Sequence, residues 1–280
     1  MAYKGTFRYR GGKSYNADFI IDQCPEGSFF VDLFGGSGCI SLAAVHSKKY
    51  RQVVYNDLDK WIYTTLTTIR DDCGALLKFL AQTPIARESC NDIYTLKSSG
   101  DPVKMAAGCI IQLCMSSITP TLHMKRSNGF LRPNIKSVSS VYSGKREWHT
   151  RLQLIRNMQE DLLEIVFENK PWQDIAKYYL KRIPSHARPE TIHNVFIADP
   201  PYGETLGYNA TADGDEVIEW FKADHPNTTK ILCNLADVEG LEQYTYLPFT
   251  YTATSSKDKL LNGIYINSND TRPQYRETFL

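Results

Sequence analysis

The residues that could do chemistry most directly are Asp199, Pro200, Pro201 and Tyr202, which follow an apolar stretch at 195–198. The two prolines fix φ twice and remove two N–H donors, which predicts a rigid, non-helical segment at a strand end. There the Asp199 carboxylate and the Pro200 carbonyl can accept both hydrogens of an amine and aim its lone pair at an electrophile. Tyr202 offers a flat face on which an extruded base can stack. A plain loop after a strand would also explain these residues, so the interpretation needs support from the rest of the chain.

A second group of residues could hold a small molecule. The segment Asp32-Leu33-Phe34-Gly35-Gly36-Ser37-Gly38 follows another apolar stretch, and its glycines allow a sharp turn and close approach by a ligand. Asp57 follows the next apolar stretch, 52–55, where a carboxylate can accept hydrogen bonds from both hydroxyls of a ribose. No Gly-Lys-Ser or Gly-Lys-Thr follows the glycines, which disfavours a phosphate-binding P-loop. A simple tight turn at the glycines and a helix N-cap at Asp57 are the alternatives.

These motifs must be positioned by alternating strands and helices, which predict an α/β fold with an open parallel sheet. The predicted strands are 28–34, 52–55, 164–168, 194–198 and 230–234, with a closing antiparallel pair at 244–252 and 263–267. The predicted helices are 15–23, 39–47, 61–70, 151–163, 172–181 and 217–223.

The stretch from 71 to about 160 breaks this alternation. Its first half has a helical pattern, whereas 119–143 is rich in Ser, Asn, Gly and Pro and is predicted to form loops, with a hairpin at Asn128-Gly129. We therefore expect one domain built from 1–72 and 161–280, and a second domain, 73–160, inserted into it.

The charge of the chain is distributed unevenly. The net charge is only +1, but residues 121–156 carry eight bases against the single acid Glu147, a local charge of +7 that leaves −6 for the rest. Such a basic face on a nearly neutral body suits an enzyme that docks on phosphates, although a solvated basic surface is the alternative. The bases are Lys125, Arg126, Arg132, Lys136, Lys145, Arg146, Arg151 and Arg156.

The composition excludes several classes of protein. Hydrophobic residues make up 42% of 280 residues, which is enough for a packed core. No apolar run approaches the roughly 18 residues of a membrane span, and the polar start of the chain does not resemble a secretory signal. The seven cysteines are scattered and form no C-x-x-C pair, which predicts buried, reduced thiols and neither a disulfide framework nor a metal site.

Four pieces of the chain, in this order and spacing, resemble the Dam-type family of DNA adenine methyltransferases. They are the aromatic-x-Gly-Gly-Lys segment at 7–13, the F-x-G-x-G segment at 34–38, the acidic strand end at 55–57 and the D-P-P-Y motif at 199–202. Their joint occurrence spans nearly the whole chain and is far more specific than any one of them. The resemblance implies a Rossmann-like, S-adenosylmethionine-dependent methyltransferase sheet, with an inserted, mainly helical target-recognition domain that contains a hairpin.

The resemblance also implies a role for each motif residue and requires no metal. Asp199 and Pro200 would hold the target amine, and Tyr202 would stack on the flipped adenine. The residues implied to bind S-adenosylmethionine are Tyr9 and Lys13 at its methionine end and adenine side, Phe34 near its sulfonium, Gly35, Gly36 and Gly38 in the turn, Asp57 at its ribose, and Asp199.

The basic middle segment resembles the part of the family that enters the DNA groove. Arginine can pair with guanine edges and asparagine with adenine, although contacts to phosphate are commoner. The residues implied to contact DNA are Lys125, Arg126, Asn128, Arg132, Lys145 and Arg146.

The chain departs from the family pattern at two places. Many relatives carry an acid, just before the helix expected at 172–181, that helps to hold the adenine of the cofactor. Here that acid is missing from 167–172, and Asn169 or Asp174 is the candidate substitute. The segment 131–134 also lacks the usual N-x-P-F-G ending, so the resemblance does not define a recognition sequence.

The implied reaction is methyl transfer from S-adenosylmethionine to the exocyclic N6 amine of a flipped adenine in double-stranded DNA, in the cytoplasm of a bacterial or phage-infected cell. A cytosine-ring methyltransferase would need a Pro-Cys nucleophile, which the chain lacks. Methylation of the cytosine amine, of RNA or of protein glutamine, and a non-catalytic nucleic-acid-binding relative are the alternatives, with Asp199 favouring adenine. No nuclease motif is present, so restriction would need a separate endonuclease; the oligomeric state is left open.

Overall fold

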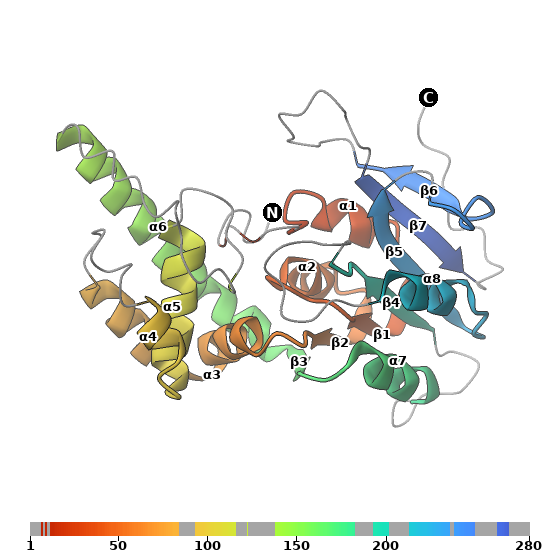
Figure 1. Cartoon of the computed structure of the whole chain (residues 1–280), viewed down its shortest axis with the longest axis horizontal. Helices are drawn as coiled ribbons and strands as arrows, with labels where there is room; N and C mark the ends of the chain where they lie inside the picture. The colour runs from red at the N-terminus through yellow and green to blue at the C-terminus, as the bar shows by residue number, and fades with distance from the viewer. Residues whose placement is uncertain are drawn as a thin grey trace.

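The computed structural model describes residues 7, 9, 12–83, 93–115, 122, 138–182, 193–201, 213–235, 238–249 and 262–268. Within these residues, seven strands form one sheet in the order β3-β2-β1-β4-β5-β7-β6 (Figure 1). The strands are β1 (Gly27–Asp32), β2 (Tyr50–Asn56), β3 (Ile165–Glu168), β4 (Asn194–Ala198), β5 (Thr228–Leu235), β6 (Thr245–Pro248) and β7 (Asn262–Ser268).

The sheet is parallel from β3 to β5 and antiparallel at its other edge. β1 pairs with β2 and β4, β2 with β3, and β4 with β5, all in parallel, whereas β7 runs antiparallel to both β5 and β6. The order 3-2-1-4-5 is that of a doubly wound Rossmann-type sheet, in which ligands bind where the strand order reverses, here between β1 and β4. The predicted α/β fold with a closing antiparallel pair is confirmed.

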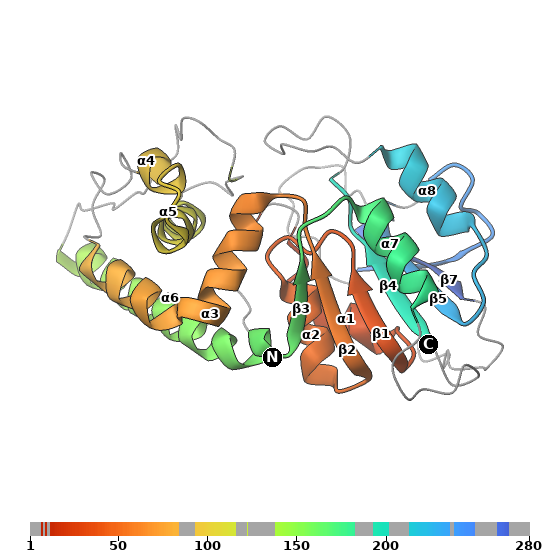
Figure 2. The same cartoon turned by 90° about the horizontal axis from the view of Figure 1, so that it is seen from below.

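Helices cover both faces of the sheet, which explains why its central strands are apolar throughout (Figures 1 and 2). Phe30 and Val53 pack in the apolar cluster of one face, together with helices α1, α2 and α3. Their neighbours Phe29 and Val54 pack in the cluster of the other face, with α7 and α8. These helices are α1 (Ala17–Asp22), α2 (Cys39–Ser47), α3 (Lys60–Gln82), α7 (Trp172–Lys181) and α8 (Gly214–Lys222).

Strand register brings the predicted motifs to one edge of the sheet. Asp32, the last residue of β1, pairs with Tyr55 of β2 on one side and with Ile197 of β4 on the other. Because the three strands are parallel, the segments that follow them leave at the same carboxyl edge. The glycine turn, Asp57 and Asp199 therefore start from neighbouring positions.

The helices α4 (Ile93–Lys97), α5 (Pro102–Met115) and much of α6 (Val138–Leu163) lie beside the sheet and cover neither of its faces (Figure 2). Two long helices join this part to the sheet. α3 has non-helical angles at Asp72 (φ −140°, ψ 40°) before it continues to Gln82, and α6 leads back into β3. Beyond the irregularity, α3 buries Leu76 and Leu80 in the same cluster as Ile110 of α5 and Ile155 of α6.

One helix extends further than the sequence predicted. α3 is interrupted at Asp72, close to the predicted helix end at Arg70, and its second part runs to Gln82 in a stretch with a predicted helical pattern. α6, however, begins at Val138, inside a stretch that was expected to form loops up to 143. Ser139, Ser140, Ser143 and Gly144 lower the local helix propensity, but packing of the later turns outweighs it. Trp148, Ile155 and Met158 of α6 are all buried. The hairpin predicted at 128–129 lies outside the described residues.

None of the described helices is long and apolar enough to cross a membrane. Five of the six described cysteines are buried, as predicted, whereas Cys39 is half-buried, and none of these six forms a disulfide. The five buried thiols belong to Cys24, Cys73, Cys109, Cys114 and Cys233.

Candidate active site

The glycine turn after β1 is held in shape by hydrogen bonds and by an aromatic ring. Gly35 N–H donates to the carbonyl of Asn56 at 2.8 Å, and Tyr55 Oη donates to the carbonyl of Gly36 at 2.8 Å. A Cβ on Gly35 would lie 2.2 Å from the Tyr55 ring. Gly36 and Gly38 have positive φ values of 50° and 75°, which residues with a side chain rarely adopt. Glycine is therefore required both by the space and by the backbone angles.

Asp57 connects this turn to the end of β2. One carboxylate oxygen accepts the N–H of Gly36 at 2.8 Å, and the other accepts the N–H of Asp59 at 2.8 Å. Asp59, and not Asp57, is the N-cap of α3, since its side chain accepts the N–H of Trp61. The helix-cap alternative for Asp57 is thereby excluded, and its half-buried carboxylate faces the glycine turn.

Asp199 forms an ion pair with Lys13 across the edge of the sheet. Lys13 Nζ lies 2.7 Å from both carboxylate oxygens, and the two side chains are only 10% and 15% exposed. Burial would lower the pKa of Lys13, but the charge and hydrogen bond of Asp199, together with contributions from Cys233 and Cys39, outweigh it and raise the pKa above its usual value. The pair therefore joins the first and last of the motifs, 186 positions apart in sequence.

Asp32 adds a third carboxylate to this edge. It is 1% exposed and accepts a hydrogen bond from Ser41 Oγ at 2.8 Å. Burial raises the pKa of Asp32 to about 7; the Ser41 hydroxyl opposes the rise, whereas the charges of Asp199 and Asp57 add to it. Three carboxyl groups are thus gathered where β1, β2 and β4 end.

The two cysteines near this edge are inert thiols. Burial raises the pKa of Cys39 to about 11 and that of Cys233 well above its usual value, and the negative charge of Asp199 adds to both shifts. A protonated thiol is a weak nucleophile. The arrangement therefore offers acceptors and charge for catalysis, and no activated sulfur.

The two candidate substitutes for the missing acid differ in their surroundings. Asn169 is half-buried, and its Nδ2 donates to the carbonyl of Asp57 at 2.6 Å. Asp174 is exposed in the first turn of α7. Only Asn169 is in direct contact with the residues at the carboxyl edge.

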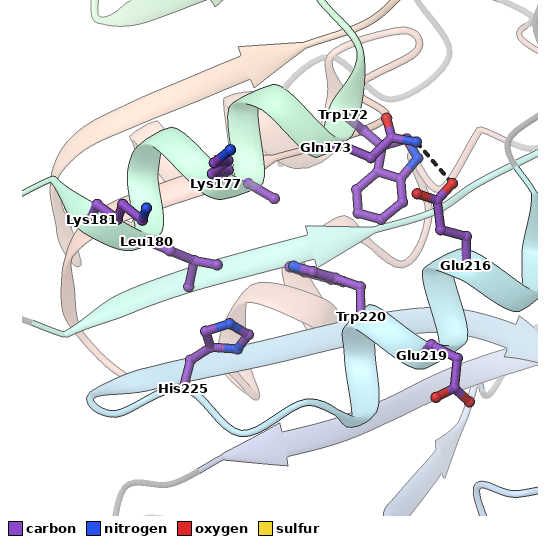
Figure 3. A pocket seen from close by; sticks show the side chains of 10 residues that line it. Trp172, Gln173, Lys177, Leu180, Lys181, Glu216, Glu219, Trp220 and His225 are labelled. Atoms are coloured by element: carbon purple, nitrogen blue, oxygen red, sulfur yellow. Dashed lines mark hydrogen bonds between the residues drawn. The ribbon is translucent and has the colours of Figure 1, made fainter.

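The ring of Phe34 packs beside α7. Its ring centroid lies 6.0 Å from that of Trp172, which in turn lies 5.7 Å from Trp220 of α8. Both tryptophans line a pocket of about 630 Å³ between α7 and α8, at one end of which Gln173 donates to Glu216 (Figure 3). None of the residues implied to bind the cofactor lines this pocket.

The structure brings most of the predicted cofactor residues together. The ring of Tyr9 would lie 3.0 Å from a Cβ on Gly36, and Gly12 N–H donates to the Tyr9 carbonyl at 3.1 Å, so the N-terminal motif rests on the glycine turn. Pro200 is buried directly after Asp199. Tyr202, Lys125, Arg126, Asn128 and Arg132 lie outside the described residues, and Lys145 and Arg146 fall within α6.

Three residues of the edge were not singled out from the sequence, namely Asp32, Asn56 and Leu58. Asn56 donates to the carbonyl of Leu33 at 3.0 Å and accepts the N–H of Lys170 at 3.1 Å, which ties three strand ends together. Leu58 is 49% exposed beside Asp57. The sequence did carry signals for these residues. Asp32 and Asn56 are polar residues at the end of a buried strand, and Leu58 is an aliphatic residue between two acids.

The described residues contain no group of His, Cys, Asp and Glu side chains that could hold a metal ion. The glycine turn, the strand-end acid and the paired aspartate lie at the reversal of strand order, where open α/β sheets bind their ligands. The chain belongs to the family described as D12 class N6 adenine-specific DNA methyltransferase, whose family model matches residues 9–239. It is therefore an adenine-specific DNA methyltransferase, as its sequence motifs predicted.

More distant similarities add little to this assignment. Two solved structures of the rRNA methyltransferase aviRa from Streptomyces viridochromogenes are 10% and 11% identical to this chain. Each covers 92% of this chain and 82% of its own, with a TM-score of 0.33, which is too low to bear on the site. No curated protein matches the sequence.

Proposed function

We propose that this adenine-specific DNA methyltransferase takes its methyl group from S-adenosylmethionine and holds the target N6 amine with Asp199 and the Pro200 carbonyl. The observation that carries the proposal is the Lys13–Asp199 ion pair, which lies beside the glycine turn at the reversal of strand order. The same edge thus offers a cofactor cradle and an acceptor pair for the amine.

The residues of the edge fit S-adenosylmethionine. A Cβ on Gly36 would come 3.0 Å from the Tyr9 ring, so glycine at this position lets the aromatic residue of the N-terminal motif pack closely on the turn. The Asp57 carboxylate holds the glycine turn through the N–H of Gly36 and lies at the end of β2, where a carboxylate can accept hydrogen bonds from ribose hydroxyls. Leu58 provides exposed apolar surface for an adenine ring, and Asn169 provides a nearby amide.

When bound, S-adenosylmethionine supplies an electrophilic methyl group. The N6 amine of adenine is a poor nucleophile because its lone pair is delocalised into the ring. Acceptors at Asp199 and Pro200 favour a more tetrahedral nitrogen with a localised lone pair, and the proton that the nitrogen must lose leaves through the Asp199 carboxylate. Most of the rate acceleration then comes from positioning.

Lys13 balances the charge of Asp199 before the amine arrives. Because Lys13 Nζ contacts both oxygens at 2.7 Å, an incoming amine has to share an oxygen with Lys13 or displace it. When the amine replaces the Lys13 ammonium group at an oxygen of Asp199, the carboxylate keeps a charge-assisted hydrogen bond throughout.

We further propose that 73–160 is the target-recognition domain of the enzyme. The irregularity of α3 at Asp72 and the position of α4 and α5 beside the sheet support such a division (Figure 2). A base must leave the duplex to reach Asp199. The basic residues of this part, including Lys145 and Arg146 of α6, would hold the phosphates while Tyr202 stacks on the flipped base.

The test is transfer of labelled methyl from S-adenosylmethionine to unmethylated double-stranded DNA, followed by nucleoside analysis. Labelled N6-methyladenine is expected with the natural enzyme, and a loss of at least a hundredfold is expected for Asp199→Ala. Asp22→Asn, an exposed aspartate at the far end of α1, is the matched control and is expected to keep full activity. Label on cytosine, or an active Asp199→Ala variant, would overturn the assignment of the site.

A further inference from the structure

A buried asparagine at the end of β2 connects this strand to both of its neighbours. Asn56, the last residue of β2, is 1% exposed. Its Nδ2 donates to the carbonyl of Leu33, just before the glycine turn, at 3.0 Å. Its Oδ1 accepts the N–H of Lys170, just after β3, at 3.1 Å. One side chain therefore reaches both neighbouring chain segments, beyond the last residues of β1 and β3 that pair with β2.

The two partners of this side chain explain why the residue is an asparagine. A backbone carbonyl can only accept a hydrogen bond and a backbone N–H can only donate one, so the side chain between them must offer a donor and an acceptor. A short amide does so, whereas an ionised aspartate has no donor and a leucine has neither. A buried backbone group that loses its partner costs free energy. Asn56 is therefore specified by its hydrogen bonds and not only by the space that it fills.

A second amide makes the reciprocal contact from the end of β3. Asn169 Nδ2 donates to the carbonyl of Asp57 at 2.6 Å, while the backbone carbonyl of Asn56 accepts the N–H of Gly35 at 2.8 Å. Asp57 in turn holds the N–H of Gly36 at 2.8 Å. The glycine turn, Asp57 and Asn169 are therefore all held together around Asn56.

We propose that Asn56 is a positioning residue for the cofactor, whose amide sets the spacing of the glycine turn, Asp57 and Asn169 and thereby the affinity for S-adenosylmethionine. This inference rests on the proposed function of the edge as the cofactor cradle. Because Asn56 is buried, it acts through the backbone groups that it holds. Without these bonds the turn and the proposed ribose acceptor would no longer be fixed at the separation that one ligand requires.

The test measures the affinity of S-adenosylhomocysteine, which cannot donate a methyl group, by calorimetric titration of Asn56→Leu and Asn56→Ala. Leucine has a similar branched shape and removes both hydrogen bonds, whereas alanine leaves room for water at the two backbone groups. In metal sites, loss of a residue that supports a ligand by hydrogen bonding typically costs 10–100-fold in affinity or activity. We expect a loss of about tenfold in each variant, the lower end of that range.

Steady-state kinetics provide a readout that a purely structural asparagine would not move. In both variants the KM for S-adenosylmethionine is expected to rise by about the same factor as the affinity falls, while kcat stays within about threefold of the natural value. The KM for DNA is expected to stay unchanged. A variant that merely contains less folded protein would instead show a lower apparent kcat at an unchanged KM.

Asn194 provides the matched control at the opposite edge of the sheet. It is the first residue of β4, is 4% exposed and donates from Nδ2 to the carbonyl of Tyr179 at 3.2 Å. Asn194→Leu is expected to lower the free energy of unfolding, as Asn56→Leu does, because each leaves a buried carbonyl without its donor. Its affinity for S-adenosylhomocysteine is expected to stay within about twofold of the natural value, since the change lies far from the cradle.

A double variant tests whether the two amides fix the same spacing. Asn56→Leu combined with Asn169→Ala is expected to lose less affinity than the product of the two single losses. The reason is that either change alone already releases the contact between the ends of β2 and β3, so the second change has less to remove.

Unchanged affinity and an unchanged KM in both Asn56 variants would overturn the inference. Failure of both variants to fold, while Asn194→Leu folds, would also overturn it, because Asn56 would then serve stability alone. A natural enzyme that binds S-adenosylhomocysteine but transfers no methyl group would count against the proposed function and leave the binding test of Asn56 valid. A natural enzyme that does not bind S-adenosylhomocysteine would overturn both.

Discussion

At the scale of single residues, the aspartates at the carboxyl edge have different tasks although they lie close together. Asp199 is paired with Lys13, Asp57 accepts two backbone N–H groups, and Asp32 is buried against Ser41. The surroundings of each carboxylate, and not its residue type, determine what it can do. Each can therefore be tested with its own substitution.

Asp57→Ala is expected to weaken S-adenosylmethionine binding at least tenfold, a loss of about 1.4 kcal/mol or more, because two ribose acceptors disappear. Asn169→Ala is expected to weaken binding by a smaller factor, because Asn169 is held against the Asp57 carbonyl. Calorimetric titration with S-adenosylhomocysteine measures both. Asp174→Ala, on the exposed first turn of α7, is the control, and a loss there equal to that of Asn169→Ala would reverse the assignment of the substitute residue.

The raised pKa of Asp32 predicts a pH-dependent effect on stability. The folded protein holds the Asp32 proton up to about pH 7, whereas the unfolded chain releases it near the usual value of 3.8. The free energy of unfolding therefore falls, as far as Asp32 contributes, while pH rises from about 4 to 7. Asp32→Asn has no such proton to lose, so its free energy of unfolding should not show this fall. Between pH 5 and pH 8 the variant should therefore gain on the order of 1 kcal/mol in stability relative to the natural protein. Urea unfolding at pH 5 and pH 8 measures the free energy of unfolding of both proteins. The same difference between variant and natural protein at the two pH values would contradict the raised pKa of Asp32.

At the scale of elements, the glycine turn and α3 show why one glycine is indispensable and another is replaceable. A Cβ on Gly35 would lie 2.2 Å from the Tyr55 ring, whereas nothing lies within 4 Å of a Cβ on Gly74 in α3. The first position is limited by tertiary packing, and the second only by helix propensity.

Gly35→Ala is therefore expected to destabilise the protein by about 2 kcal/mol or more, since the aromatic ring must move in a packed core. Gly74→Ala is expected to stabilise it by about 0.5–1 kcal/mol, as is usual for such a change inside a helix. Thermal unfolding of the two variants compares them directly. Equal effects would mean that the turn adjusts to a side chain more easily than the packing around Tyr55 indicates.

The helices also show where local sequence is a poor guide. The carboxyl ends of β1, β2 and β4 were located to within two residues, because apolar runs followed by Gly or Asp are a strong local signal. The start of α6 was missed because Ser139, Ser140 and Ser143 suggest a loop, whereas the buried face around Trp148 and Ile155 stabilises a longer helix. Helix ends depend on packing partners that a local pattern does not contain.

At the scale of the whole molecule, basic charge is concentrated in one stretch of the sequence, 121–156, and the rest of the chain is weakly acidic. This distribution predicts DNA binding that weakens as salt rises, with a slope set by the number of phosphates that the protein neutralises. Lys145→Ala combined with Arg146→Ala should flatten a plot of log affinity against log salt by up to about 1.8, that is about 0.9 for each phosphate that is no longer neutralised. Lys177→Ala with Lys181→Ala removes the same charge from exposed positions on α7 and should leave the slope unchanged. Equal changes in both double variants would mean that the effect follows net charge alone.

The sequence by itself determined the class of fold, the strand ends and the motifs from which the family was predicted, because these depend on residues that are near each other in the chain. It did not reveal that Lys13 contacts Asp199 across 186 positions, or that Lys97 is buried against Trp61 and Leu122. A charged residue in a sequence is expected at the surface, and only the packing of distant elements supplies the partners that allow it to be buried. The tertiary structure alone also decided that Asp59 caps α3, which leaves Asp57 facing the glycine turn.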